Sequence, residues 1–162
     1  MKSASSAHAL AWQLETVLTR EAAQLRAMPE TRALERPTAD GWSRKEELGH
    51  LIDSAVNNHV RFVAASLQDH FSGPSYQQDG WVRAHGYHDM PFTTLVDLWE
   101  AHNTLLTAVI QRIPDDKLAV RCRIGDGEEA TLGFIVEDYI IHMQHHLDHL
   151  LGHEKVTPYP PV

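Results

Sequence analysis

Cysteine is almost absent from this sequence, because Cys122 is the only one in 162 residues. A single thiol excludes an internal disulfide and favours a reducing compartment. No apolar run approaches the roughly 20 residues of a transmembrane helix. The first ten residues also lack the basic head and apolar core of a signal peptide. We therefore expect a cytoplasmic protein with no membrane partner, in which Cys122 is a passive thiol.

Clusters of positive charge are missing as well. The formal net charge is −8, from 14 Lys and Arg residues against 22 Asp and Glu residues. Proteins that bind nucleic acid gather Lys and Arg on one surface to neutralise phosphates. Nucleic acid is therefore not an expected partner.

Several catalytic motifs do not occur. The sequence has no G-x-S-x-G nucleophile turn, no P-loop and no G-x-G-x-x-G motif. It also lacks the H-E-x-x-H sequence of zincin proteases. No Glu stands three residues before a histidine of the cluster at 142–149, as the E-x-x-H pairs of di-iron bundles would require. Serine hydrolases, nucleotide-binding enzymes, zincins and di-iron proteins are thus not indicated.

Four segments carry apolar residues at helical spacing, and 43% of the chain is hydrophobic. The second segment has a clear start, because Ser43 and Glu46 stand at the spacing of a capping box. A Pro-rich tail at 156–162 cannot be helical. We predict a single all-α domain over 1–162, a four-helix bundle. Its helices are expected at 6–28, 43–69, 93–112 and 131–152.

The longest connection, residues 70–91, is rich in Gly and Pro and is predicted to be a loop. A connection of this length is often functional. Its aromatic residues Tyr76, Trp81 and Tyr87 either cover a pocket or pack the loop onto the bundle. Residues 119–124 give a weak indication of a short extended segment.

Histidine is the abundant residue, with twelve in the chain and four of them within 142–149. Residues four apart on a helix share one face, so two such histidines can bind one metal ion. His142 with His146 have this spacing, as do His145 with His149 and His149 with His153. Imidazole is a good ligand for zinc, nickel, iron(II) or copper. Spacing alone leaves all three pairs open.

A third ligand has to come from another segment, and His50 is the candidate in the second helix. Asp53, Asn57 and Arg61 follow it on an otherwise apolar helix. A buried polar stripe is costly unless its members are paired or bind something. Asp53 or Asn57 could orient ligands or water, whereas His50 taken alone could equally be a hydrogen-bonded structural residue. Asp53, Asp79 and Asp138 are weak candidates for a general acid or base.

Three segments together resemble the DinB-like superfamily, and within it the YfiT-like metal-dependent hydrolases. They are GWSRKEELGHLIDSAVNNHVRF (41–62), SYQQDGW (75–81) and VEDYIIHMQHHLDHL (136–150). The resemblance implies an up-down-down-up four-helix bundle and one divalent metal ion, usually nickel or zinc. Its ligands match His50, His142 and His146, and His149 matches a position that is not a ligand. The resemblance also implies a homodimer.

Three neutral histidines leave coordination positions open, as catalytic metal sites do. The resemblance therefore implies either a hydrolase acting on a small molecule or an S-transferase that activates a low-molecular-weight thiol. The alternative is a bundle that binds metal or a small molecule without turnover. We expect side chains around the centre to orient the ligands or line the pocket, the candidates being Asp53, Asn57, Trp81, Asp138 and His149.

Overall fold

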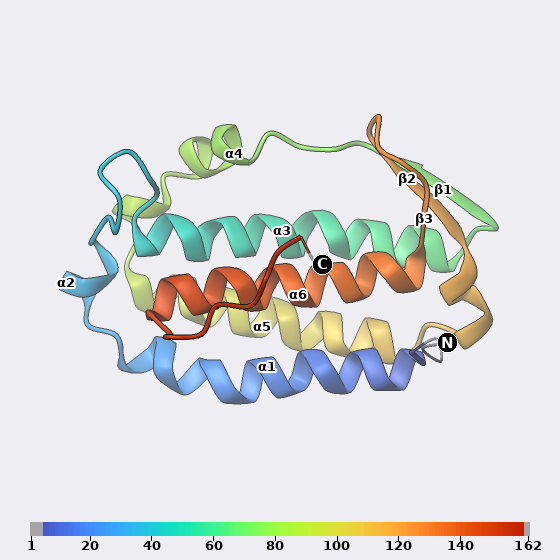
Figure 1. The fold of residues 1–162 in the computed structure, drawn as a ribbon, viewed down its shortest axis with the longest axis horizontal. Coiled ribbons are helices and arrows are strands. Elements are labelled where there is room, and N and C mark those ends of the chain that lie inside the picture. The colour runs from blue at the N-terminus through green and yellow to red at the C-terminus, as the bar shows by residue number, and fades with distance from the viewer. Residues whose placement is uncertain (1–4, 161–162) are drawn as a thin grey trace.

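Four long helices lie side by side in the computed structural model, which describes residues 5–160 (Figure 1). Each coincides with a segment predicted from apolar spacing, so the all-α four-helix bundle is confirmed. The second helix was expected to reach residue 69, but it ends at Ser66, because the chain then becomes extended and enters a strand at His70. The helices are α1 (Ala7–Ala27), α3 (Arg44–Ser66), α5 (Phe92–Gln111) and α6 (Leu132–Leu151).

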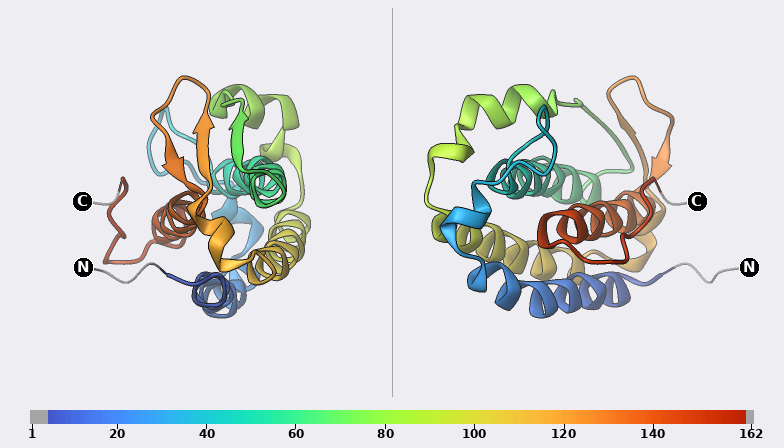
Figure 2. Two further views of the ribbon diagram at one scale, coloured as in Figure 1. Left: turned by 90° about the vertical axis from the view of Figure 1, so that its right-hand side faces the viewer. Right: turned by 60° about the vertical axis from the view of Figure 1, so that its left-hand side comes forward.

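The bundle has the up-down-down-up order, with α1 and α6 running one way and α3 and α5 the other (Figure 1). Helix α1 packs against α5 and α6, and α3 packs against the same two helices, so α1 and α3 are diagonal neighbours. The end-on view in Figure 2 shows this square arrangement. Because α3 and α5 are parallel, the chain has to return along the whole bundle between them, which explains the long connection after α3.

Polar side chains cap the start of two helices, and one of them is the predicted Ser43. The Ser43 hydroxyl accepts a hydrogen bond from the Glu46 amide at 3.3 Å, and the Glu46 carboxylate accepts one from the Ser43 amide at 2.8 Å. This reciprocal capping box satisfies amide groups that the first turn of α3 leaves free. Thr131 caps α6 by accepting from the Phe134 amide at 3.2 Å. The caps fix where the two helices that carry the clustered histidines begin.

The connection between α3 and α5 is not the plain loop that was predicted. It contains strand β1 (His70–Gly73), helix α4 (Gln78–His85) and a 3₁₀ turn (Tyr87–Asp89). Strand β1 pairs in parallel with β2 (Arg121–Ile124), which pairs antiparallel with β3 (Ala130–Thr131). The extended segment expected within 119–124 is thus confirmed as β2. Strand β1 was missed because its partner lies about fifty residues away in the sequence and no local pattern reveals it.

The core fills the space between the four helices with apolar side chains, among which Trp99, Phe62 and Met143 are fully buried. Gly49 lets the connection between α3 and α5, called the crossover below, approach α3. A Cβ at this position would lie 2.0 Å from a ring carbon of Tyr87. Tyr87 is buried there and therefore packs the connection onto the bundle. Within residues 5–160, no helix has the length and apolar character needed to cross a membrane.

Candidate metal centre

The structure brings together three histidines from two antiparallel helices. His50 projects from α3, and His142 and His146 lie one turn apart on α6. The Nε2 atoms of His50 and His142 are 3.1 Å apart, and one ring nitrogen from each of the three residues lies within 4.8 Å of the others. The ring centroids are 4.5 to 5.0 Å apart. Of the three pairs that spacing allowed on the fourth helix, His142 with His146 is the pair that meets His50.

Burial keeps the imidazoles of His50 and His142 neutral. His50 is fully buried and His142 nearly so. Desolvation, reinforced by the neighbouring His146, lowers the pKa of His50 to about 3. Desolvation, reinforced by the neighbouring His146, His50 and His145, lowers the pKa of His142 to about 3. A neutral imidazole has a free lone pair, which a metal ligand requires. His50 and His142 are thus held in the neutral form that binds a cation.

Glu47 orients the third histidine. Its carboxylate accepts a hydrogen bond from Nδ1 of His146 at 3.0 Å, which leaves Nε2 of that ring with the free lone pair. Such a carboxylate behind a histidine fixes the tautomer and raises its basicity as a ligand. The sequence prediction missed this residue, although Glu47 stands three residues before His50. The two residues have E-x-x-H spacing but lie outside the histidine cluster at 142–149.

The donor set fits a divalent ion such as zinc or nickel. With zinc–nitrogen bonds of about 2.0–2.1 Å, two ligand nitrogens of a tetrahedral site lie about 3.3 Å apart. The Nε2 atoms of His50 and His142 match this at 3.1 Å. The three ligand nitrogens together lie within 4.8 Å of one another, so the set would close slightly around an ion. Nδ1 of His50 finds no hydrogen-bond partner within residues 5–160. Trp42, also missed from the sequence, packs its ring 4.8 Å from that of His50 and shields this side of the cluster.

A cavity of about 250 Å³ adjoins the cluster at His142. Its walls also include Arg61 and Tyr76 from the α3 side and Asp138 and Tyr159 from the other. Asp138 is one turn before His142 on α6. Burial raises the pKa of Asp138, although a hydrogen bond from the Tyr159 hydroxyl at 3.1 Å works in the opposite direction. The cavity thus places a carboxyl group beside the histidines.

A larger cavity, of about 440 Å³, lies between the start of α1 and the start of α6. Leu10, Leu118 and Phe134 line it, and it contains none of the three clustered histidines. Size alone does not make a reaction site. The smaller cavity is the better candidate for a substrate site, because it adjoins the histidine cluster.

Two residues of the predicted polar stripe are paired with groups other than the clustered histidines. The carboxylate of Asp53 is buried and accepts hydrogen bonds from the Tyr87 hydroxyl at 2.6 Å and from Nδ1 of His85 at 3.0 Å. Burial raises the pKa of Asp53, and these two partners oppose the rise. The Asn57 amide donates to the main-chain carbonyl of Asp53 at 2.9 Å. The structure therefore places Asp53 against the crossover.

Among the remaining predicted residues, only Asp138 lines the cavity. Trp81 packs on Tyr76, with ring centroids 5.2 Å apart, and so supports the cavity wall from behind. Asp79 is exposed at the start of α4. His149 stacks on His145 at 4.7 Å and is not brought to the metal cluster.

The C-terminal tail forms one wall of the cavity. The ring of Tyr159 lies 5.0 Å from that of His142. Buried Asp148 anchors the tail, because its carboxylate accepts from the Thr157 amide at 2.7 Å and from Nδ1 of His153 at 2.9 Å. Although burial alone would raise its pKa, these and further hydrogen bonds hold the pKa of Asp148 below its ordinary value.

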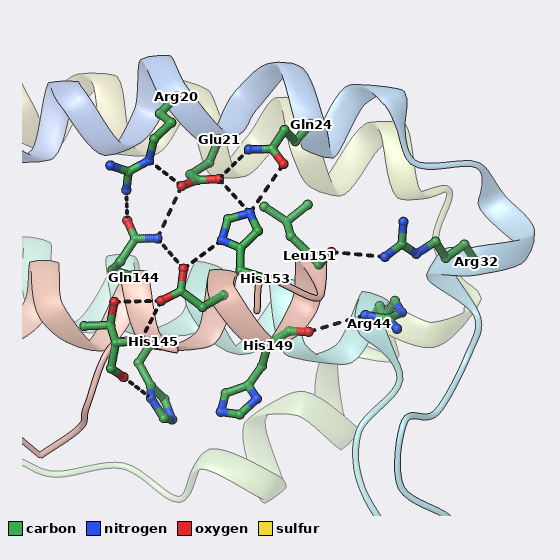
Figure 3. Close-up of polar contacts among 12 residues, drawn as sticks. Arg20, Glu21, Gln24, Arg32, Arg44, Gln144, His145, His149, Leu151 and His153 are labelled. Atoms are coloured by element: carbon green, nitrogen blue, oxygen red, sulfur yellow. Dashed lines mark hydrogen bonds and ion pairs between the residues drawn. The ribbon is translucent and has the colours of Figure 1, made fainter. Parts of the chain in front are cut away.

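Hydrogen bonds through Gln144 connect the anchored tail to helix α1 (Figure 3). Gln144 donates to Asp148 at 2.7 Å and to the fully buried Glu21 at 3.3 Å. Glu21 also accepts from Arg20 at 2.7 Å. A buried carboxylate is stable only when it is paired in this way. The network thus fixes the tail against both helices, and the tail carries Tyr159 to the cavity.

Comparison with known proteins gives consistent matches. A family model described as the DinB superfamily matches residues 13–150. The protein of Halalkalibacterium halodurans named "Putative metal-dependent hydrolase BH0277" is 22% identical over 111 residues, and the match spans 68% of this chain and 64% of that relative, less than two thirds of its length. A solved structure, YfiT from Bacillus subtilis, superimposes with a TM-score of 0.83 at 19% identity, covering 94% of this chain and 89% of that one. It is described as a probable metal-dependent hydrolase with an unusual four-helix bundle topology.

Proposed function

Since this chain belongs to the DinB superfamily, we propose that it is a divalent-metal-dependent hydrolase of a small molecule. The metal, zinc or nickel, is held by His50, His142 and His146. The two relatives named above carry descriptions as metal-dependent hydrolases, which supports the proposal.

The observation that carries the proposal is the convergence of three imidazoles beside a cavity, with His50 and His142 held neutral by burial. Within the described part of the chain, no carboxylate joins this group of potential ligands. Three protein ligands leave an open position, as in catalytic zinc sites. A divalent ion bound there supplies Lewis-acid polarisation and makes water acidic enough to react near neutral pH.

The chain's own residues would position and protonate the reacting groups. Glu47 holds His146 in one tautomer through its Nδ1 proton. Asp138 lies beside His142 in the cavity wall, and its raised pKa brings it closer to the working range of a general base or acid. The Tyr159 hydroxyl donates to this carboxylate and holds its orientation.

Metal analysis tests the ligand assignment. We expect about one divalent ion per chain by plasma mass spectrometry, and its loss in the double variant His142→Ala/His146→Ala. The matched control is His59→Ala/His102→Ala, which removes the histidine pair of α3 and α5 whose ring nitrogens are 3.1 Å apart. Equal metal content in the two double variants would reject the assignment. Ester and amide panels with and without chelator then test hydrolysis.

Transfer of a low-molecular-weight thiol is a second candidate for the same centre. The chain's own thiol, Cys122, is buried in β2 and burial raises its pKa, so a reacting thiolate would come from solution. A centre with three neutral ligands keeps the full charge of the ion and would stabilise a thiolate. Cobalt-substituted protein distinguishes the two activities, because a thiolate ligand gives a sulfur-to-cobalt charge-transfer band. Metal binding without turnover in either assay would instead support the non-catalytic alternative.

Self-association stays a prediction of the family resemblance. We expect a homodimer, and light scattering coupled to size-exclusion chromatography checks it. A mass near 18.3 kDa, that of one chain, would contradict it.

A further inference from the structure

Arg61 is a partly buried cation in the wall of the cavity beside the histidine cluster. Its guanidinium donates to the main-chain carbonyl of Pro74 at 3.1 Å and to the Asn58 side chain at 3.5 Å. Both acceptors are neutral. Within residues 5–160, no carboxylate lies at ion-pair distance from Arg61, whereas Arg20, Arg26, Arg36 and Arg44 each have one.

A cation taken partly out of water without a counter-ion is unfavourable. Consistently, burial lowers the pKa of Arg61, although the neighbouring Tyr76 opposes this. The guanidinium therefore has unused capacity to bind an anion, and the cavity is the space in which an anion could reach it.

The register of the two helices places Arg61 and the histidine cluster at opposite ends of the cavity. Arg61 follows His50 by eleven residues, about 16 Å along α3. Helix α6 runs antiparallel to α3, so its earlier residues Ile135 and Asp138 lie toward Arg61 and its later residue His142 lies toward His50. A molecule in the cavity can thus contact the Arg61 cation at one end and His142, the member of the cluster that lines the wall, at the other.

We propose that this cavity binds a small carboxylate, with its carboxylate group on Arg61 and its reacting group at the histidine cluster. A guanidinium matches a carboxylate with two parallel hydrogen bonds. A singly charged group fits better than a phosphate dianion, because Arg61 is the single Lys or Arg side chain among the described wall residues and Asp138 faces the same space. Aromatic residues Tyr76 and Tyr159 flank the body of the molecule.

The contact between the molecule's reacting group and the histidine cluster rests on the proposed function. The contact between its carboxylate and Arg61 does not need the metal. It can be tested on chelated protein, so failure of the metal site and failure of the anion site are distinguishable. The competing explanation is that Arg61 only ties the crossover to α3 through the Pro74 carbonyl.

The probes are N-benzoylglycine and its primary amide, which have nearly the same shape and differ in charge. Their affinities are measured by ¹H–¹⁵N NMR titration of chelated protein, together with the amides around the cavity that shift. A charge-assisted hydrogen-bonded pair predicts that the wild type binds the carboxylate about tenfold or more tightly than the amide. Arg61→Gln should abolish this preference, and Arg61→Lys should keep part of it.

Arg112→Gln is the matched control, since Arg112 is exposed at the end of α5 and bonds only its own helix at Ala108. It removes the same charge and should keep the full preference for the carboxylate. Equal affinity for the two probes, a preference that survives in Arg61→Gln, or no shift of cavity amides would each overturn the proposal. A thermal unfolding curve of Arg61→Gln in the wild-type range, with the preference lost, separates ligand binding from a merely structural role. Metal content of the same variant, expected unchanged, reports on the histidine site independently.

Discussion

Removing metal should make this protein sensitive to acid already at pH 5, above the ordinary pKa values of most carboxyl groups. His50 and His142 have pKa values lowered to about 3 by burial and by their histidine neighbours, against about 6.5 in an unfolded chain. Between these values the unfolded chain binds more protons than the folded one. The free energy of unfolding therefore falls as pH decreases from about 6.5 toward 3 and is constant above this window.

The size of the effect follows from the two shifts. Each imidazole contributes about 1.4 kcal/mol per pH unit below its unfolded pKa. At pH 5 this amounts to about 2 kcal/mol for each histidine, and about 4 kcal/mol for the pair, relative to pH 7.5. A loss of 4 kcal/mol is a large part of the 5–15 kcal/mol that typically stabilises a domain, so it should be easy to measure.

Urea unfolding of chelated protein at pH 7.5 and pH 5.0 is the appropriate assay. His142→Gln, which cannot titrate, should lose about half of the pH dependence, or about 2 kcal/mol. His8→Gln, a control at an exposed position of α1, should keep all of it. If His142→Gln and the parent protein showed the same difference between the two pH values, the claim that burial keeps this cluster neutral would be wrong.

Three further outcomes are expected. Added zinc or nickel should raise the melting temperature at pH 8, because the ion binds only the folded state. This increase should vanish with chelator, and it should be smaller at pH 5 because protons compete for the ligands. Scanning calorimetry at the two pH values, with and without chelator, checks it. Glu47→Gln should weaken metal affinity about 10- to 100-fold, since His146 loses the carboxylate on Nδ1. Competition with a chromogenic chelator measures this affinity. An unchanged affinity would mean that Glu47 is only a surface group. Asp148→Asn should cost about 1–3 kcal/mol by leaving the Thr157 donors poorly paired, and faster hydrogen exchange of the Thr157 amide than in the parent protein should accompany it.

The sequence by itself was sufficient for the helices and for the three candidate histidine pairs on the fourth helix. Apolar residues recur at helical spacing in all four segments, and the capping box of Ser43 and Glu46 is a local motif, so both can be recognised without knowing the fold. The spacing of His142 and His146 likewise depends on one helix only. These features are set by interactions between residues three or four apart, which sequence patterns record directly.

The tertiary structure decided what lies opposite each helix face. Glu47 could be assigned to His146 only after α3 and α6 were placed antiparallel, and Tyr159 reaches His142 because buried Asp148 anchors the tail. For the same reason Asp53 pairs with Tyr87 of the crossover. Contacts between residues tens of positions apart depend on the packing of whole helices. Their physical basis, burial and charge pairing in three dimensions, leaves no periodic trace in the sequence.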